Sequence, residues 1–521
     1  MRHLLISLML GSSLSAMAAE GKIPDAAQAF QTHCASCHGT DRLGGLGPAL
    51  LPENLGRLRK GEAEKVIAEG RPATQMPAFQ GLIDPVLIGA LREFIYTPPA
   101  EMPVWDEVAI LGSRIVHADV SKLPAKPAFT ADPMNLFIVV ESGDHHASIV
   151  DGDRLTPIHR FPTRFALHGG PKFSPDGRFV YFASRDGWVT KYDIWNLTPV
   201  AEVRAGINTR NAAVSSDGKF IAVANYLPHS LVILDSDLKP VRVLPVADTA
   251  GKQSSRVSAV YDAGPRKSFV AALKDVKEVW EISYDPTKPD IPNGMVHDFQ
   301  YKEGAFKKAF LNPQRTRVDD YLDDFFFTQD YADLMGASRT AGRGQVINLD
   351  ARRKVADLEL PGMPHLGSGI TWAWEGRTVM ATPNLNQGVV SIIDTVNWQT
   401  VRNIETLGPG FFMRSHENSR YAWTDSMMSK THKDTLQVID KQTLAVVARL
   451  RPEPGKTLAH VEFTRDGRYV LASLWERKAD GGCLIVYDAN TLQEIKRLPM
   501  DKPVGKYNLY NKINRSEGTS H

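Results

Sequence analysis

The feature that most constrains this chain is a short phrase that recurs through its second half. The phrase reads Ser/Thr-x-Asp-Gly-Arg/Lys, and an aromatic or β-branched strand follows it, then a second strand that ends in aspartate. Clear copies start at Ser174, Ser215 and Thr464. The Asp-Gly pairs predict hairpin turns, because glycine adopts positive φ without a steric penalty. The spacing of about 40 to 48 residues between neighbouring copies is that of one four-stranded propeller blade.

The repeat therefore predicts an all-β propeller over residues 131–521. Eight blades are expected, and seven is the competing count. The Trp-Asp and Gly-His marks of WD-type repeats are absent from these units. Residues 319–327 interrupt the pattern, and we expect them to form an insertion or a lid. The eight units begin near residues 132, 173, 214, 257, 320, 370, 415 and 462.

The chain begins with the pattern of a secretory signal. A basic start at Arg2 precedes an apolar run, and Ala16-Met17-Ala18 supplies small residues for cleavage, so residues 1–18 are predicted to be removed. The run is shorter than the about 20 apolar residues that span a bilayer, and no later stretch is long enough. We expect a periplasmic protein without a membrane span in its mature form. The net charge of +2 gives no global reason to expect a nucleic-acid partner.

A Cys-x-x-Cys-His motif at Cys34, Cys37 and His38 predicts covalent attachment of one haem c, with His38 as an axial iron ligand. The same cysteines would also suit a redox disulfide or half of a zinc site. Zinc needs further Cys or His ligands nearby, and none follows before His117. Export favours haem, because c-type haem is attached outside the cytoplasm.

Met76 is the expected second ligand of this haem. It lies in a Pro-containing segment that cannot continue a helix, and a Met/His pair suits electron transfer. Helices are predicted over residues 26–32, 63–69 and 85–96. The N-terminal part is therefore expected to be a mainly α cytochrome c domain over residues 19–100, joined by a Pro-rich linker over residues 101–130.

Several polar residues stand where blades begin, close to the propeller axis. A single histidine of this kind is more often structural, but three at equivalent repeat positions favour a shared ligand or acid–base site. Arginines that converge there would bind carboxylates through paired hydrogen bonds, as a tetrapyrrole with acidic side chains requires. The histidines are His168, His365 and His460, with His416 as a weaker fourth, and the arginines are Arg185, Arg210, Arg256 and Arg414.

A haem c motif followed by an eight-bladed propeller resembles the cytochrome cd1 nitrite reductase family over nearly the whole mature length. The marks that carry the resemblance are Ser184–Gly187, Gly206–Arg210, Pro364–Gly367 and Gly505–Asn511. The resemblance implies that His168 is the proximal ligand of haem d1 and that His365 lies on its distal side. It also implies that Arg185 and Arg210 bind the carboxylates of that haem.

The sequence departs from the nitrite reductases in two places. Their second distal histidine falls on Ala309–Pro313, which contains none, and their N-terminal arm before the haem c is missing. In both places the sequence instead resembles a paralogous branch of the family that completes haem d1 synthesis. His460 and Tyr507 match the positions which that branch uses beside the reacting propionate, and Tyr510 is the alternative to Tyr507.

The resemblance thus implies a periplasmic oxidoreductase of haem d1 biosynthesis. It would oxidise a propionate side chain of dihydro-haem d1 to an acrylate and pass electrons through its c-type haem to a periplasmic acceptor. Other haem d1 assembly proteins and the nitrite reductase are the further partners it suggests. Two alternatives remain at this stage: a cd1-type nitrite reductase that forms nitric oxide, and a non-enzymatic haem d1 carrier.

Overall fold

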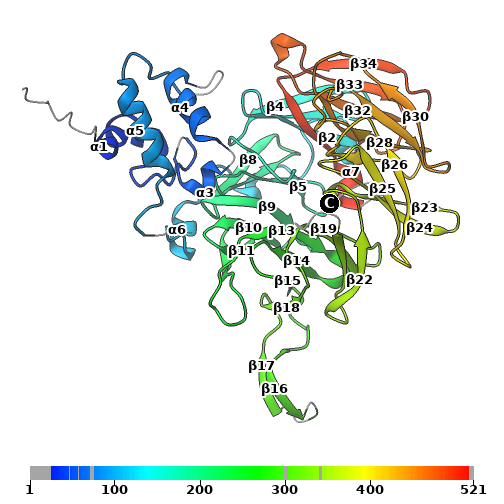
Figure 1. Ribbon diagram of the computed structural model, residues 1–521, viewed down its shortest axis with the longest axis horizontal. Coiled ribbons are helices and arrows are strands. Elements are labelled where there is room, and N and C mark those ends of the chain that lie inside the picture. Colours follow the sequence, from blue (N-terminus) through cyan, green and yellow to red (C-terminus); the bar gives the residue numbers. More distant parts are fainter. Residues whose placement is uncertain are drawn as a thin grey trace, which may run out of the picture.

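The computed structural model describes residues 25–514, apart from positions 46, 57, 71–75, 102, 299, 301–302 and 339–342. The predicted signal over residues 1–18 lies outside this part. A small helical body sits beside a large β propeller (Figure 1). No helix in the described part is long and apolar enough to cross a membrane.

The helical body confirms the three predicted helices. The first helix, α1, is capped by Asp25, whose carboxylate accepts from Gln28 N at 3.0 Å, and α5 begins with Pro85 after the capping Asp84. Their apolar faces pack around the fully buried Phe30. The helices are α1 (Ala26–His33), α2 (Ala35–His38), α3 (Pro52–Leu55), α4 (Lys60–Glu69) and α5 (Pro85–Tyr96).

Within the described residues, the chain from Leu136 onward forms eight sheets of four main strands each, which confirms the eight-bladed propeller. In each sheet, successive strands pair antiparallel, from an inner strand near the axis to an outer strand. The first four blades contain β2 (Leu136–Glu141), β3 (His146–Asp151), β4 (Thr156–Pro162); β5 (Lys172–Phe173), β6 (Phe179–Ala183), β7 (Trp188–Asp193), β8 (Thr198–Arg204); β9 (Asn208–Val214), β10 (Phe220–Leu227), β11 (Ser230–Asp235), β12 (Pro240–Pro245); and β13 (Val257–Ala263), β14 (Ser268–Leu273), β15 (Glu278–Ser283), β18 (Pro313–Arg317).

The other blades repeat this order, and the inner strand of the first blade comes from the far end of the chain. The strands are β19 (Leu322–Phe327), β20 (Asp333–Ser338), β21 (Arg343–Asn348), β22 (Arg353–Glu359); β23 (Ile370–Trp374), β24 (Arg377–Pro383), β25 (Val389–Asp394), β26 (Thr400–Glu405); β27 (Met413–Arg414), β28 (Tyr421–Asp425), β29 (Leu436–Asp440), β30 (Ala445–Leu450); β31 (Leu458–Phe463), β32 (Tyr469–Leu474), β33 (Cys483–Asp488), β34 (Glu494–Pro499); and β35 (Pro503–Asn508).

Strand β35 closes the ring by pairing antiparallel with β2, with Tyr507 opposite Ile138. Closure of this kind removes the exposed edges that an open array of sheets would present. The short helix α7 (Leu509–Asn514) follows β35 directly, and its Leu509 is fully buried. The last strand and helix therefore belong to the central part of the propeller.

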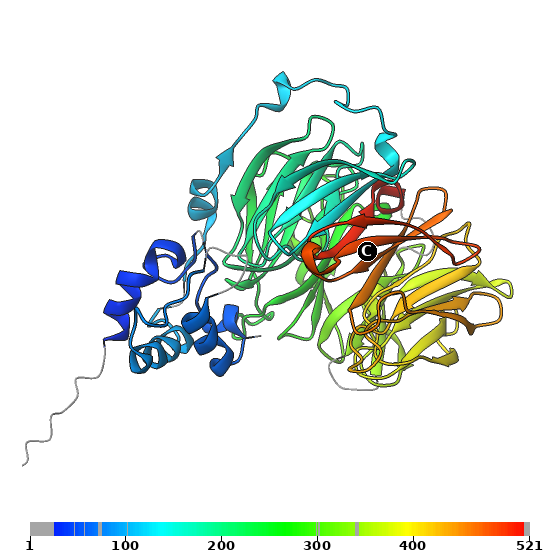
Figure 2. The same cartoon turned by 90° about the horizontal axis from the view of Figure 1, so that it is seen from above.

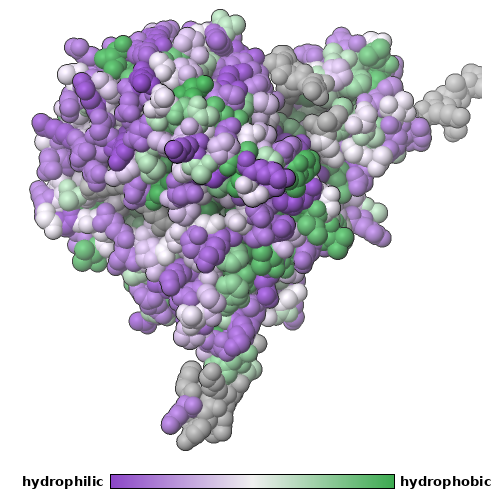
Figure 3. All heavy atoms as spheres, turned by 180° about the vertical axis from the view of Figure 1, so that it is seen from behind, coloured by the Kyte–Doolittle hydropathy of each residue, from purple (hydrophilic) through white to green (hydrophobic). Residues whose placement is uncertain are grey.

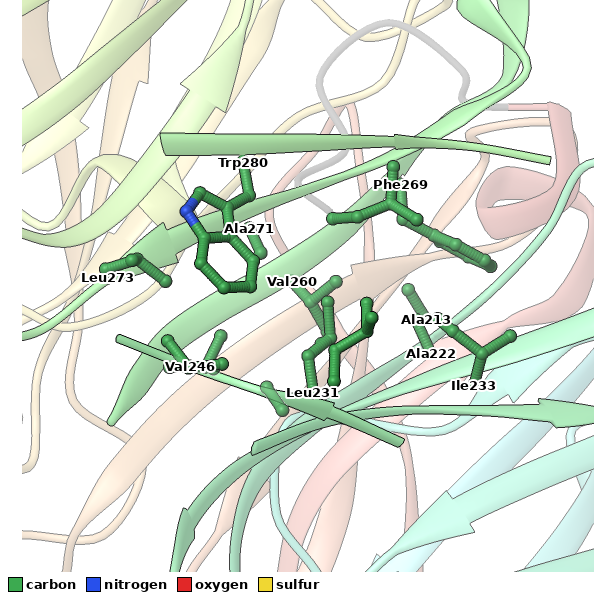
Figure 4. Close-up of a cluster of buried hydrophobic side chains, with 14 of the residues drawn as sticks. Ala213, Ala222, Leu231, Ile233, Val246, Val260, Phe269, Ala271, Leu273 and Trp280 are labelled. Carbon is green, nitrogen blue, oxygen red and sulfur yellow. The ribbon is translucent and has the colours of Figure 1, made fainter. Parts of the chain in front are cut away.

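Neighbouring blades are held together by buried apolar side chains from facing sheets. Figure 4 shows one such layer, where Leu231 and Ile233 of the third blade lie against Val260, Phe269 and Trp280 of the fourth. These strands read as almost continuous apolar runs because both of their faces are covered. The predicted Asp-Gly turns are also present, since Gly177, Gly218 and Gly467 have φ of 72°, 71° and 75°.

The structure corrects one expectation about the repeat. Residues 319–327 are not an insertion, because Leu322–Phe327 form β19, the inner strand of the fifth blade. The insertion lies earlier, where β16 (Ile291–Asp298) and β17 (Glu303–Lys307) form a separate two-stranded hairpin that projects from the fourth blade (Figure 1). The run of Asp and Phe residues in β19 departs from the repeat phrase in sequence, although it forms a regular strand.

The segment between the two bodies follows the outside of the propeller (Figure 2). It contains α6 (Glu107–Gly112), β1 (Ile115–Val116) and a 3₁₀ turn at Val120–Lys122. Strand β1 pairs with β8 and adds a fifth strand to the second blade. The face of the molecule seen in Figure 3 is mostly polar, with smaller apolar patches scattered over it.

Candidate haem sites

The first candidate site lies in the helical body, around His38. The imidazole is 7% exposed, and its Nδ1 lies 2.8 Å from the Pro48 carbonyl oxygen. The ring is tightly enclosed, because a Cβ at Gly47 would lie 2.8 Å from His38 Cε1. Burial lowers the pKa of His38. The ring is therefore neutral and oriented, with Nε2 as the nitrogen that can bind a metal.

Cys34 and Met76 pack on the same apolar cluster as Phe30, so a thiol and a thioether lie against one apolar core. Burial and the neighbouring Cys37 raise the pKa of the Cys34 thiol to about 11. A thiol of such high pKa is a poor match for a reactive dithiol or a zinc thiolate. Among the described residues, no group of three or more His, Cys, Asp or Glu side chains could hold a metal ion. The residues present fit a covalently attached haem better than zinc.

The second candidate site lies on the propeller axis, and one half of it is strongly basic. His168, just before the second blade, has its Nδ1 2.6 Å from the Arg210 carbonyl oxygen. The guanidinium groups of Arg185 and Arg210 approach His168 Nε2 to 2.8 and 3.1 Å. Burial lowers the pKa of Arg210, but nearby Asp324 of β19 and other acidic groups outweigh it and raise the pKa; Asp324 also accepts a hydrogen bond from Tyr261 at 2.7 Å. Two guanidinium groups around one imidazole suit an anionic ligand.

The other half of this site is aromatic. The Nδ1 of His365 lies 2.8 Å from the Phe411 carbonyl oxygen, and the two rings are 4.2 Å apart. Phe411 contacts Phe412 at 4.6 Å, and Phe412 contacts His460 at 4.7 Å between ring centroids. The ring of Tyr507 follows at 5.1 Å from His460. These contacts link the sixth, seventh, eighth and first blades.

The two halves meet at Gly170, two residues after His168. A Cβ at this position would lie 2.9 Å from Tyr507 Cε1, and the backbone has φ of 69°. Glycine meets both the close approach and the left-handed backbone. The candidate residues thus form a continuous circuit of side chains around the axis.

His460 reaches this circuit through a distortion of its strand. The pairing of β31 with β32 skips this residue, and His460 has φ of 51°. A β-bulge of this kind turns one side chain out of the regular alternation, and bulges of this type are common beside active sites. The backbone oxygen of His460 accepts from the buried Lys506, which holds the bulge in place.

The imidazole of His460 is 1% exposed, and neither ring nitrogen has a hydrogen-bond partner within the described part of the chain. Burial, followed by the cations Lys506, Arg414 and Lys512, lowers the pKa of His460 well below 6.5. The ring is therefore neutral at physiological pH. Arg414, which is 3% exposed, likewise has a buried Nε without a hydrogen-bond partner there. Unsatisfied buried groups of this kind indicate a place for a polar ligand.

Asp425 supports both aromatic neighbours of the histidines. Its carboxylate accepts from Phe411 N at 2.8 Å and from Phe412 N at 3.1 Å. Burial raises the pKa of Asp425 to about 6. These three residues were not predicted from the sequence, because Phe411 and Phe412 lie before β27 in a segment without the repeat phrase and Asp425 ends β28 without a local signal.

The structure also shows which predicted residues lie apart from this circuit. Arg256 is bound by Asp275 through two hydrogen bonds of 2.8 and 2.6 Å, so its charge is already paired. His416 is fully buried in a turn, where its Nδ1 accepts from Asn418 N at 3.1 Å. Tyr510 stacks under the guanidinium of Arg465 at 4.6 Å.

One comparison with the nitrite reductases was wrong. Ala309–Pro313, where their second distal histidine was expected to fall, leads into β18, which is the outer strand of the fourth blade. The lack of histidine there therefore says nothing about the axis. The side chain beside His365 is Asp324, whose Oδ2 lies 3.9 Å from His365 Nε2.

The nitrogen atoms of the histidines divide them into two kinds. In His38, His168 and His365, Nδ1 lies within 2.8 Å of a backbone carbonyl oxygen, and in His168 the guanidinium groups of Arg185 and Arg210 lie against Nε2. Metal-binding histidines almost always have this second bond. His460 has none. Basic side chains, aromatic faces and histidines of both kinds around one axis fit an iron tetrapyrrole with acidic side chains.

Comparison with known proteins agrees with this geometry. Residues 131–512 match the family described as cytochrome D1 heme domain, and residues 21–95 match cytochrome C oxidase, cbb3-type, subunit III. The chain belongs to the cytochrome D1 heme domain family. More specifically, it is 56% identical to the dihydro-heme d1 dehydrogenase of Pseudomonas aeruginosa over 99% of this chain and all of that protein.

A solved structure and a more distant relative extend the comparison. The structure of dihydro-heme d1 dehydrogenase NirN in complex with DHE has a TM-score of 0.87 and 56% identity, and the match covers 94% of this chain and all of that one. The nitrite reductase of Stutzerimonas stutzeri is 24% identical over 98% of this chain and 99% of its own length. Full-length similarity is therefore much stronger to the dehydrogenase than to the reductase.

Proposed function

We propose that this protein acts as a dihydro-haem d1 dehydrogenase in the periplasm. It removes two hydrogens from a propionate side chain of dihydro-haem d1 and leaves an acrylate. Its parts are an export segment (1–18), a cytochrome c domain (19–100), a linker (101–130) and a d1-binding propeller (131–521). The observation that carries the proposal is the contrast between three histidines fixed through Nδ1 and the unbonded His460 beside Tyr507.

In this proposal His168 and His365 are the residues that hold the iron of the substrate. Their Nδ1 bonds to backbone carbonyl oxygens set the tautomer in which Nε2 is an acceptor, and the guanidinium groups of Arg185 and Arg210 that lie against His168 Nε2 would turn to the macrocycle when it binds. Arg185 and Arg210 neutralise carboxylates of the macrocycle through charge-assisted hydrogen bonds. Arg256 would bind a carboxylate of the macrocycle only by giving up its ion pair with Asp275.

His460 is the general base. A neutral imidazole without a competing hydrogen bond can accept a proton from a propionate carbon, and the electron pair of that C–H bond enters the conjugated ring of the substrate. Burial raises the pKa of Tyr507 to about 12, so its hydroxyl stays protonated and can donate a hydrogen bond or relay a proton. Arg414, whose Nε lies 3.8 Å from a carboxylate oxygen of Glu462, can stabilise negative charge near the same carbon.

The reaction releases two protons and two electrons for each acrylate that forms. One-electron transfer is the chemistry that a haem c held by Cys34, Cys37, His38 and Met76 would supply. The electrons then require an external one-electron acceptor in the periplasm. Haem d1 assembly proteins and the nitrite reductase are the expected recipients of the product.

Mass analysis of the pigment tests this function directly. The purified holoprotein is incubated anaerobically with dihydro-haem d1 and ferricyanide. The molecular mass of the extracted tetrapyrrole is then measured by mass spectrometry. We expect the loss of two hydrogen atoms, and a Tyr510→Phe variant should behave like the parent because Tyr510 stacks on Arg465 instead. A bound pigment of unchanged mass would favour a carrier, and nitric oxide formed from nitrite would favour a reductase.

A further inference from the structure

The contact between the helical body and the propeller is built on the crossover from β8 to β9, residues 204–208. Ile207 and Leu227 form one buried cluster with Ala49 and Leu51, which follow the loop that packs on His38. Asn54 Nδ2 donates to Ile207 O at 3.1 Å, across the same contact. The two bodies therefore meet through packed side chains and direct hydrogen bonds.

Arg204 lies at the centre of this contact and is 5% exposed. Its Nε donates to Asp186 O at 2.8 Å, and its Nη2 donates to Leu43 O. The guanidinium also stacks on Trp105 at 5.0 Å, and Trp105 Nε1 donates to Arg204 O at 2.7 Å. Its backbone N–H donates to Ser113 Oγ at 2.9 Å. One residue thus joins the helical body, the connecting segment and the second blade.

Both carbonyl oxygens that accept from this guanidinium belong to loops that lead to a candidate haem site. Leu43 lies in the loop whose Gly47 packs against the ring of His38. Asp186 directly follows Arg185, whose guanidinium lies 2.8 Å from His168 Nε2. The planar fork of an arginine can bond two such acceptors at once, which a lysine ammonium cannot do with the same geometry.

We propose that Arg204 is a positioning residue that fixes the cytochrome domain against the propeller, and so sets the separation of the two haem sites for electron transfer. The proposal rests on the proposed function for its electron-transfer consequence. The docking role itself rests only on the contacts of Arg204. Burial lowers the pKa of the Arg204 guanidinium, because backbone carbonyl oxygens replace part of the water around the cation.

The test compares Arg204→Met with Arg204→Lys and with a matched control, Arg315→Met. Arg315 also donates to a backbone carbonyl, Ala247 O at 2.9 Å, and stacks on a tryptophan, Trp280 at 4.7 Å, but it lies in the fourth blade. Hydrogen exchange is measured on peptides 41–51 and 184–188 of each holoprotein. We expect faster exchange in both peptides for Arg204→Met, an intermediate rate for Arg204→Lys, and the parent rate for Arg315→Met.

A single-turnover experiment adds the kinetic consequence. Reduction of haem c by bound dihydro-haem d1 should slow roughly tenfold to hundredfold in Arg204→Met, because small displacements far from the chemistry have effects of this size. Substrate affinity, the haem c spectrum and reduction by ascorbate should not change. Unchanged exchange in peptides 41–51 and 184–188 overturns the docking role, and so does an equal effect in Arg315→Met. If the parent protein does not oxidise the substrate while exchange still responds to Arg204, the proposed function fails and the docking role stands.

Discussion

The buried histidines on the two sides of the propeller site differ in the hydrogen bonds of their ring nitrogens. His168 and His365 have an Nδ1 bonded to a backbone carbonyl oxygen and carboxylates or arginines as neighbours. His460 has aromatic rings on both sides and no hydrogen bond to its ring within the described part of the chain. The comparison teaches that the hydrogen bond at the Nδ1 atom, more than the place in a repeat, distinguishes the proposed iron ligands from the proposed base.

The three histidines also differ in the backbone element that carries them. His168 and His365 lie outside the strands, before β5 and β23, whereas His460 is a bulged residue inside β31. A loop lets the backbone turn to offer a carbonyl oxygen to a neighbouring Nδ1. A bulge between two paired residues points the ring inward and leaves both nitrogens to the ligand.

Replacing His460 by Ala gives the largest expected effect. Loss of the proposed general base should lower the rate by about 10²–10⁴-fold, while uptake of the tetrapyrrole should stay at the parent level because the proposed function gives His460 no bond to the iron. Product formation is followed by mass and binding by the absorbance of the bound pigment. Loss of binding in this variant would remove the distinction between the two kinds of histidine.

The His168→Gly variant tests the other side. Removal of an oriented ligand should weaken tetrapyrrole binding by roughly 10–100-fold, and added imidazole should restore the absorption spectrum of the bound iron. The matched His416→Gly variant alters a buried histidine that lies in a turn. A spectrum that does not respond to the His168 replacement would contradict its assignment as a ligand.

A smaller effect is expected for Tyr507→Phe. The phenol stays protonated because its pKa is raised to about 12, so the variant loses one donor and keeps its ring contact with His460 at 5.1 Å. We expect about a tenfold lower kcat, equal to about 1.4 kcal/mol in the barrier, with unchanged KM. A raised KM at constant kcat would instead make Tyr507 a binding residue.

The smallest effect concerns pH. Since the folded protein holds the pKa of His460 well below 6.5, the base remains neutral as pH falls from 8 toward 6.5 and becomes protonated only in more acidic solution. The kcat/KM profile should therefore be flat over that interval and decline on the acid side. A profile that falls by half near pH 6.5 would show an ordinary, solvated imidazole.

Much of the fold could be predicted from the sequence because its signals are local. The Asp-Gly turns at Gly177, Gly218 and Gly467 mark blades, and Cys34, Cys37 and His38 mark a haem site within five residues. The insertion was misplaced since the acidic and aromatic run of β19 resembles a loop in composition, although Phe325 is fully buried.

The site could be predicted only in part, since its chemistry depends on contacts between distant blades. The propeller histidines occur at similar repeat positions, and only the fold shows that Phe411 O binds His365 while nothing described binds His460. Arg256 stood among the arginines by sequence, yet Asp275 pairs with it. Asp425 has no local signal, because its role is to fix two backbone N–H groups of another loop.

Strand β35, which closes the ring, determines when the propeller site forms during folding. Tyr507 lies on β35, whose partner β2 stands some 370 residues earlier, and the bulge at His460 is held by Lys506 of the same strand. Base and phenol are brought together only when this long-range pairing forms. A chain in which β35 has not yet paired with β2 would contain His168 and His365 but would lack the contact between His460 and Tyr507, so the proposed reactive pair forms only with the last step of folding.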